Sequence, residues 1–464
     1  MTDVLVRTAD ELVAARDSGA RRIVVRGEID GLPTLTLAPG QEVVGEGDAA
    51  ALRFASGRDG LVLTRDNVVS GLRVEVEPAR CAIGTDGTIA DLGALRLAGL
   101  VVTGRVLVRA GRGHVEIDGM DIVAADTRAE PDRPSLLGVG ALPGAFTLWN
   151  RETDPAAVVT AQLRGLRAGR PEAPVRGSGI LVAGTPAGGR VEVARLETGP
   201  VFTDGGLAEG TADAITGGVF VATGATVGEV RNLGPVTTYG VNDMVLDNWG
   251  AVEQWVAEAP LTSYGRAGVG MVNFGSLGTL RILAPIETFG PGARGFNVYR
   301  LDGETGPTVD RAEFESITTH GDGAVGIQIG QPIGQLVVHK GIETAGADGD
   351  SLVRGQIVRQ FAHALSVPPG GRVTSIEVGG RLAAAGAAVT TVHVGGEVSA
   401  MRVAGGIRAA GVGADAVHVQ GGTIRLTDTE VHAQDGVAVR VSGGDVRLDQ
   451  VRAHGRAGDV VVER

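Results

Sequence analysis

The stretch PVTTYG at residues 235–240 returns as PLTSYG at 260–265 and as PIETFG at 285–290. Two looser copies begin at Ser316 and Gly341, so that successive starts are 25, 25, 31 and 25 residues apart. A Gly- and Asp-rich loop at 301–307 accounts for the longer third interval. A fixed period in the twenties, made of alternating strands, predicts a β-solenoid in which each repeat is one coil.

Paired glycines continue this rhythm toward the C-terminus, at 370–371, 395–396, 421–422 and 443–444. A leucine-rich repeat would need an L-x-x-L-x-L consensus, which we do not find, and a propeller would need a period of about 40 or more. We therefore predict an all-β chain: a single-stranded right-handed parallel β-helix that forms one domain over residues 1–464.

Three parts of the chain depart from the regular repeat. Residues 1–20 are predicted to cap the first coil with a short helix, where Thr8 and Glu11 have the spacing of a capping box. Residues 126–178 break the rhythm and are predicted to form an inserted loop or flap. Residues 365–464 alternate Val, Ala, Gly and Thr with few aromatics, which predicts C-terminal scaffold coils or an oligomer contact.

Composition excludes several classes of function. The formal net charge of −12 argues against nucleic acid or an anionic membrane as the main partner. The single cysteine, Cys81, rules out a disulfide within the chain and a cysteine zinc site. No apolar run is long enough to span a membrane, and the first residues do not form a signal peptide. These features predict a soluble cytoplasmic protein with no cofactor and no metal.

The opening strands are IVVRG at 23–27 and VVGEG at 43–47, after the predicted capping helix. They resemble the start of right-handed parallel β-helix proteins of the pectate-lyase-like superfamily, and the likeness in architecture covers nearly the whole chain. The resemblance implies sugar substrates. The polygalacturonase motifs N-T-D, D-D, G-H-G and R-I-K are missing, as is a pectate-lyase calcium-and-arginine cluster. Fold alone does not give function.

Strand alternation assigns the repeat positions to faces. The columns that contain Val236, Thr238, Met244 and Leu246 are predicted to point inward. The column of Tyr239, Tyr264, Phe289 and His320 should face out unless the glycine turn swings it inside. Two further columns are predicted to face out: Asp247, Val272, Asn297, Gln328 and Val353, and Trp249, Phe274, Tyr299, Gly330 and Gly355.

Outward polar and aromatic residues concentrate between 239 and 299, which makes this face the predicted site. Glycoside hydrolysis needs two carboxyl groups on either side of the scissile bond, one of them with a raised pKa. The predicted catalytic residues are Asp247, Glu287 and Asp243. The predicted substrate-binding residues are Trp249, Phe274, Tyr299, Asn297, Arg294, Tyr264 and His320.

The leading hypothesis is a carbohydrate-active enzyme that cleaves or rearranges a glycosidic bond of an oligosaccharide or small sugar. One alternative is a non-catalytic carbohydrate-binding or structural β-helix that forms oligomers, with a homotrimer favoured. A further alternative is a polysaccharide lyase or a sugar epimerase. Aromatic stacks on neighbouring coils are also common as structural features, since like residues pack well at this spacing.

Overall fold

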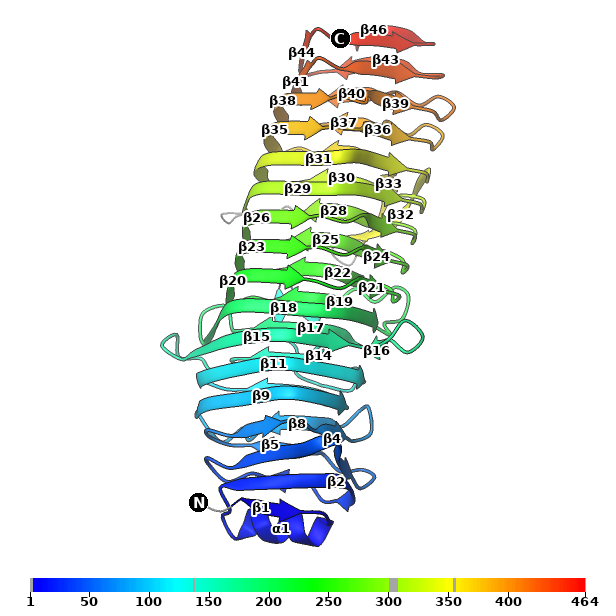
Figure 1. Ribbon diagram of the computed structural model, residues 1–464. Coiled ribbons are helices and arrows are strands. Elements are labelled where there is room, and N and C mark those ends of the chain that lie inside the picture. Colours follow the sequence, from blue (N-terminus) through cyan, green and yellow to red (C-terminus); the bar gives the residue numbers. More distant parts are fainter. Residues whose placement is uncertain (1–2, 137, 300–307, 354–355, 464) are drawn as a thin grey trace. The chain divides into compact units, whose positions relative to one another are not determined.

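The computed structural model describes residues 3–136, 138–299, 308–353 and 356–463. It divides into two compact units: unit 1, Met1–Gly206 with Thr216–Gly234, and unit 2, Leu207–Ile215 with Pro235–Arg464. In each unit, strands pair in parallel with the equivalent strands of the neighbouring coils, so each is a parallel β-solenoid (Figure 1). The prediction of a single domain stays a prediction. The predicted loop at 301–307 lies outside the described residues.

Unit 1 begins with the predicted cap. Helix α1 (Ala9–Asp17) packs against the first strands, and its side chains Leu12 and Ala15 are buried. Thr8 is the N-cap, and its Oγ1 accepts the backbone N–H of Glu11 at 3.3 Å. The Glu11 carboxylate accepts the N–H of Arg7 at 2.7 Å, one residue before the position that a capping box predicts.

Two long parallel sheets make up the coils of unit 1. The first contains β1 (Val4–Val6), β2 (Arg22–Leu32), β4 (Glu42–Phe54), β6 (Val68–Ser70), β7 (Arg73–Glu75), β9 (Asp91–Thr103), β11 (Arg112–Ala124), β15 (Val158–Ala168), β16 (Val175–Arg176), β18 (Arg190–Asp204) and β20 (Ala225–Asn232). The second contains β3 (Leu35–Thr36), β5 (Leu61–Leu63), β8 (Cys81–Thr85), β10 (Arg105–Arg109), β14 (Gly144–Trp149), β17 (Ser178–Ala183) and β19 (Ala214–Val221).

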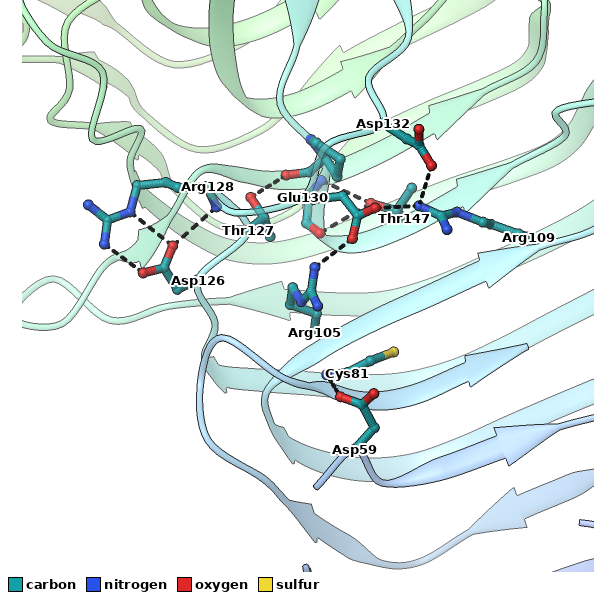
Figure 2. A network of polar contacts seen from close by, with 12 residues as sticks. Asp59, Cys81, Arg105, Arg109, Asp126, Thr127, Arg128, Glu130, Asp132 and Thr147 are labelled. Carbon is teal, nitrogen blue, oxygen red and sulfur yellow. Dashed lines mark hydrogen bonds and ion pairs between the residues drawn. The ribbon is translucent and has the colours of Figure 1, made fainter. Parts of the chain in front are cut away.

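The predicted insertion at 126–178 is only partly irregular. Strands β14 and β15 within it belong to the coils, and a short hairpin, β12 (Ser135–Leu136) and β13 (Val139–Ala141), precedes them. Residues 126–134 lie against the outer side of β10. There Glu130 accepts hydrogen bonds of 2.7 Å from both Arg105 and Arg109 (Figure 2). Ion pairs therefore hold this segment to the coil.

Unit 2 repeats the same arrangement. Its first sheet contains β21 (Val236–Thr238), β23 (Ala251–Ala257), β24 (Leu261–Ser263), β26 (Ser276–Ile282), β27 (Ile286–Thr288), β29 (Thr308–Thr319), β31 (Pro332–Thr344), β35 (Arg372–Val378), β36 (Arg381–Ala384), β38 (Glu397–Val403), β39 (Ile407–Ala409), β41 (Thr423–Thr427), β42 (Glu430–Ala433), β44 (Asp445–Asp449) and β45 (Arg452–Gly455). Its second contains β22 (Asp243–Asn248), β25 (Val269–Asn273), β28 (Arg294–Val298), β30 (Val325–Ile329), β34 (Leu365–Val367), β37 (Val392–Val394), β40 (Val417–Gln420), β43 (Val437–Ser442) and β46 (Gly458–Glu463).

The register of unit 2 confirms that equal positions of successive repeats are vertical neighbours. Val236 pairs with Leu261, and Leu261 pairs with Ile286. Two positions on, Thr238 and Ser263 are fully buried, and the Thr238 hydroxyl donates to the Ser263 hydroxyl at 3.1 Å. The predicted inward hydroxyl column is therefore confirmed.

One part of the predicted alignment is wrong. The predicted columns of Met244, Leu246 and Asp247 extend to Asp350, Leu352 and Val353. In the structure these residues do not continue the columns of β28 and β30, because β32 (Asp348–Val353) and β33 (Gln356–Phe361) pair with each other as an antiparallel hairpin. The second sheet resumes at β34, where Leu365 pairs with Ile327. The hairpin is seated on the coils, since the Ser351 hydroxyl donates to the Gly292 carbonyl at 2.9 Å.

Candidate functional site

An aromatic ladder forms on unit 2, from Tyr239, Tyr264, Phe289 and His320. Consecutive ring centroids are 5.3, 4.9 and 4.5 Å apart, with interplanar angles of 6°, 11° and 5°. Each residue immediately follows a paired strand of the first sheet, so register places the rings one above another. The side chains of Tyr264 and Phe289 remain 49% and 36% exposed, which confirms that this column faces out.

Glycine after each ring permits this close stacking. A Cβ atom at Gly265 would lie 1.6 Å from the carbonyl oxygen of Gly240, and one at Gly290 would lie 1.9 Å from that of Gly265. Any side chain at these positions would therefore push neighbouring coils apart. This need for glycine explains why Tyr-Gly and Phe-Gly pairs recur in the sequence.

The ladder has polar groups beside it. The carboxylate of Glu287, two residues before Phe289, accepts a hydrogen bond from Nε2 of His320 at 2.8 Å. Thr262 and Thr318 precede and follow Glu287 in the same register column, and all three side chains are partly exposed. Carboxylate, imidazole and hydroxyl groups are thus presented next to the rings.

The second aromatic column is more deeply covered. Trp249 and Phe274 meet edge to face with centroids 6.2 Å apart, and Phe274 stacks on Tyr299 at 4.8 Å. Trp249 is only 6% exposed, whereas Phe274 and Tyr299 are half-buried. A flat platform of three open rings, as predicted from the sequence, is therefore reduced to two partly covered rings.

The predicted catalytic carboxylates do not come together. Asp247 and Asp243 lie on β22 in the second sheet and are fully buried, whereas Glu287 lies on β27 in the first sheet and is partly exposed. Burial raises the pKa of Asp247 well above its usual range, and the contact with Trp249 offsets this only in part. The raised pKa matches a general acid, yet the carboxyl group has no exposed surface.

The column of Asp247 faces outward, as its later members on β37 and β40 show. The same register position is taken there by His393 and His418, which are partly exposed. In the middle coils the position is covered, because Asp247, Val272 and Asn297 are at most 3% exposed.

Three predicted binding residues meet on one strand. Arg294, Asn297 and Tyr299 lie on or directly after β28, and the hairpin β32–β33 contacts Arg294 through Gln360. Arg294 belongs to the column of Met244, which strand alternation predicts to point inward. This prediction is wrong for Arg294, because its guanidinium reaches Gln328 of the outward column and Gln360 of the hairpin.

The environment of Arg294 is unusual for a charged group. The side chain is 4% exposed, and burial lowers its pKa to about 10. Its donors meet neutral oxygens: Oε1 of Gln328 at 3.2 Å, the carbonyl of Gly292 at 3.3 Å and Oε1 of Gln360 at 2.7 Å. Below the pKa of about 10, a positive charge is therefore held in a buried, amide-lined position.

Sequence reasoning missed the hairpin, although a signal for it exists. Gly321, Gly346, Gly386 and Gly411 occupy successive turns of neighbouring coils. Their spacing is 25, 40 and 25 residues, and the middle interval holds the hairpin. The hairpin brings Gln360 to the site, and no local pattern around Gln360 indicates that role.

Among residues 3–136, 138–299, 308–353 and 356–463, no group of three His, Cys, Asp or Glu side chains is arranged to hold a metal ion. In the same part of the chain, no helix has the length and apolar character to cross a membrane.

Comparisons with protein-family models, with curated proteins and with solved structures found no match to this chain.

Proposed function

We propose that this protein binds an oligosaccharide along the aromatic ladder of unit 2. The observation that carries the proposal is the line of four stacked rings, two of them a third to a half exposed, repeated once per coil. A ligand extended along the coils meets an equivalent group at each step. The likeness in sequence to pectate-lyase-like β-helices, whose usual substrates are sugars, supports the same class of ligand.

The stacking decides how a sugar is bound. Ring faces within the ladder are covered by the rings above and below, so the ladder presents ring edges and phenol hydroxyls rather than open faces. Glu287, His320 and the hydroxyls of Thr262 and Thr318 add hydrogen-bonding groups beside these edges. Recognition therefore rests on hydrogen bonds to sugar hydroxyls, with the rings as an apolar border.

Cleavage of a glycosidic bond stays a prediction. Glu287 is the predicted catalytic residue that is partly exposed, and its partner at hydrogen-bond distance is His320 rather than a second carboxylate. If the ladder face is catalytic, Glu287→Gln removes turnover while binding persists. If the face only binds, wild type and Glu287→Gln release no reducing ends from any bound sugar.

A second candidate function is a contact between copies of the chain. Exposed apolar strips on a protein surface commonly mark such contacts. The exposure of Tyr264 and Phe289 supports this alternative, in which the predicted homotrimer would cover the ladder.

Isothermal titration with a panel of neutral and acidic oligosaccharides tests the proposal. We expect a saturable signal with the wild type, and loss of that signal with Tyr264→Ala. Val412→Ala is the matched control, because Val412 is a 74% exposed apolar residue of unit 2 outside the ladder. Binding that survives Tyr264→Ala contradicts the proposal. A change in molar mass with Tyr264→Ala, without any sugar binding, establishes the oligomer contact instead.

A further inference from the structure

Arg294 carries a buried positive charge that meets no carboxylate among the described residues. Among the described residues, no Asp or Glu carboxylate lies within ion-pair distance of its guanidinium, and the interactions that set its pKa are burial and a charge interaction with Tyr299. A buried charge is normally paired, because taking it out of water is costly. The hairpin therefore covers a charge that is only partly compensated.

The present partners of Arg294 are replaceable. A guanidinium has five N–H donors, and three hydrogen bonds are formed here, two of them at 3.2 and 3.3 Å. Both side-chain partners, Gln328 and Gln360, are neutral and partly exposed. A carboxylate forms shorter, bidentate bonds with the same fork of donors and is the partner that arginine geometry favours.

Hydroxyl-binding groups lie beside this charge. Asn297 is 3% exposed and lies on the same strand as Arg294. Tyr299, two residues further on, is half-buried and acts electrostatically on Arg294. An amide side chain and a phenol hydroxyl can each donate to and accept from the hydroxyl groups of a ligand.

We propose that Arg294, Asn297 and Tyr299 form a binding site for a small hydroxylated carboxylate. The carboxylate pairs with the guanidinium of Arg294 and displaces the amide oxygens of Gln328 and Gln360, which hold its place in the free protein. Asn297 and Tyr299 bind hydroxyl groups of the same ligand. The ligand enters past the partly exposed amides. This site uses different residues from the ladder and goes beyond the proposed function.

Thermal shift and isothermal titration with gluconate test the site, with glucose as the neutral control and sulfate as the alternative anion. We expect gluconate to bind saturably and to raise the melting temperature. Glucose and sulfate should bind at least tenfold more weakly. Equal effects of gluconate and glucose, or of gluconate and sulfate, would overturn the carboxylate assignment.

Variants separate a binding site from a structural tie between the hairpin and the coil. Arg294→Met should lose the gluconate response, and Arg294→Lys should weaken it at least tenfold, because lysine cannot form the bidentate fork. Arg359→Met is the matched control: Arg359 lies on the same hairpin but already has Asp348 and Asp350 as partners. Retention of gluconate binding in a folded Arg294→Met or Arg294→Lys protein contradicts the proposal.

The two proposals fail separately. Tyr264→Ala should leave gluconate binding unchanged while it abolishes oligosaccharide binding. Loss of gluconate binding in Tyr264→Ala would show that the two regions are one site and would overturn the independence of the Arg294 site.

Discussion

Two segments, one in each unit, are fastened over the outer side of a coil, and they differ in how charge is balanced. In unit 1, Glu130 lies between Arg105 and Arg109, and Asp132 approaches Arg109 at 3.7 Å (Figure 2). Asp132 also pairs with Arg151 at 2.7 Å. In unit 2, Arg294 contacts the hairpin β32–β33 through the amide oxygen of Gln360. Its other two hydrogen-bond partners among the described residues, Gln328 and the Gly292 carbonyl, are also neutral oxygens. In unit 1 the arginines that hold the segment are paired with carboxylates. In unit 2 the arginine that holds the hairpin has only neutral partners among the described residues, so it can still bind an anion.

The largest expected effect comes from opening the closed network. Glu130→Gln leaves two partly buried arginines without their shared carboxylate, and the Glu130 side chain itself is only 11% exposed. Loss of one partner of a buried pair costs about 3–5 kcal/mol, and partial exposure reduces this to about 3 kcal/mol or less. Urea unfolding followed by circular dichroism measures the change.

The control for that experiment is Glu430→Gln, which removes an ion pair between side chains that are more than half exposed. We expect no measurable change from it, as for most surface pairs. If Glu130→Gln is equally silent, the segment at 126–134 is not held by its charges.

Acid should destabilise unit 2 through His363, which follows the hairpin. Burial lowers the pKa of His363 to about 4, although its hydrogen bond to the Thr390 carbonyl opposes this. An unfolded histidine titrates near 6.5, so stability is full above about pH 6.5 and is lost as the pH falls toward 4.

At pH 4.5 the loss from this one group is about 2.5 kcal/mol. His363→Gln should flatten the dependence of the urea midpoint on pH between 6.5 and 4.5. The control is His114→Gln, since His114 is an exposed residue of unit 1. An unchanged slope in His363→Gln would mean that other groups control acid unfolding.

The smallest expected effect is at Asp247. Because burial raises its pKa above the unfolded value near 3.9, the folded protein is penalised at neutral pH, and the penalty fades as the pH falls. Asp247→Asn should stabilise the protein at pH 7, and this gain should disappear at pH 3. Destabilisation by Asp247→Asn at pH 7 would show that the carboxylate is compensated, as Glu130 is.

The fold was predictable because the stacking of coils restricts which residue types can occupy equivalent positions. Residues such as Tyr264 and Phe289 must match their vertical neighbours, and Gly265 and Gly290 must leave room for the coil below, so the period survives in the residue types. The N-terminal helix was predictable for the same local reason, through Thr8 and Glu11. Local rules of this kind act within one coil or between adjacent coils.

The site was less predictable because its burial is set by distant segments. Alternation correctly turned the column of Asp247 outward, but it could not indicate that the middle coils are covered. Asp350 and Leu352 fit the alternating pattern of a coil strand, although they form a hairpin that brings Gln360 to Arg294. The contact between Arg294 and Gln360 joins residues 66 positions apart, and such a contact does not appear as a repeat in the sequence.

A crystal structure of the protein soaked with gluconate tests the central comparison most directly. We predict density for a carboxylate within hydrogen-bond distance of the Arg294 guanidinium, with the Gln360 side chain displaced, and none at Arg105 or Arg109, whose charges Glu130 already meets. If the hydrogen bonds from Arg294 to Gln328 and Gln360 are unchanged at saturating gluconate, the account is contradicted. The amide oxygens would then be the permanent partners of the guanidinium, and no carboxylate would bind it.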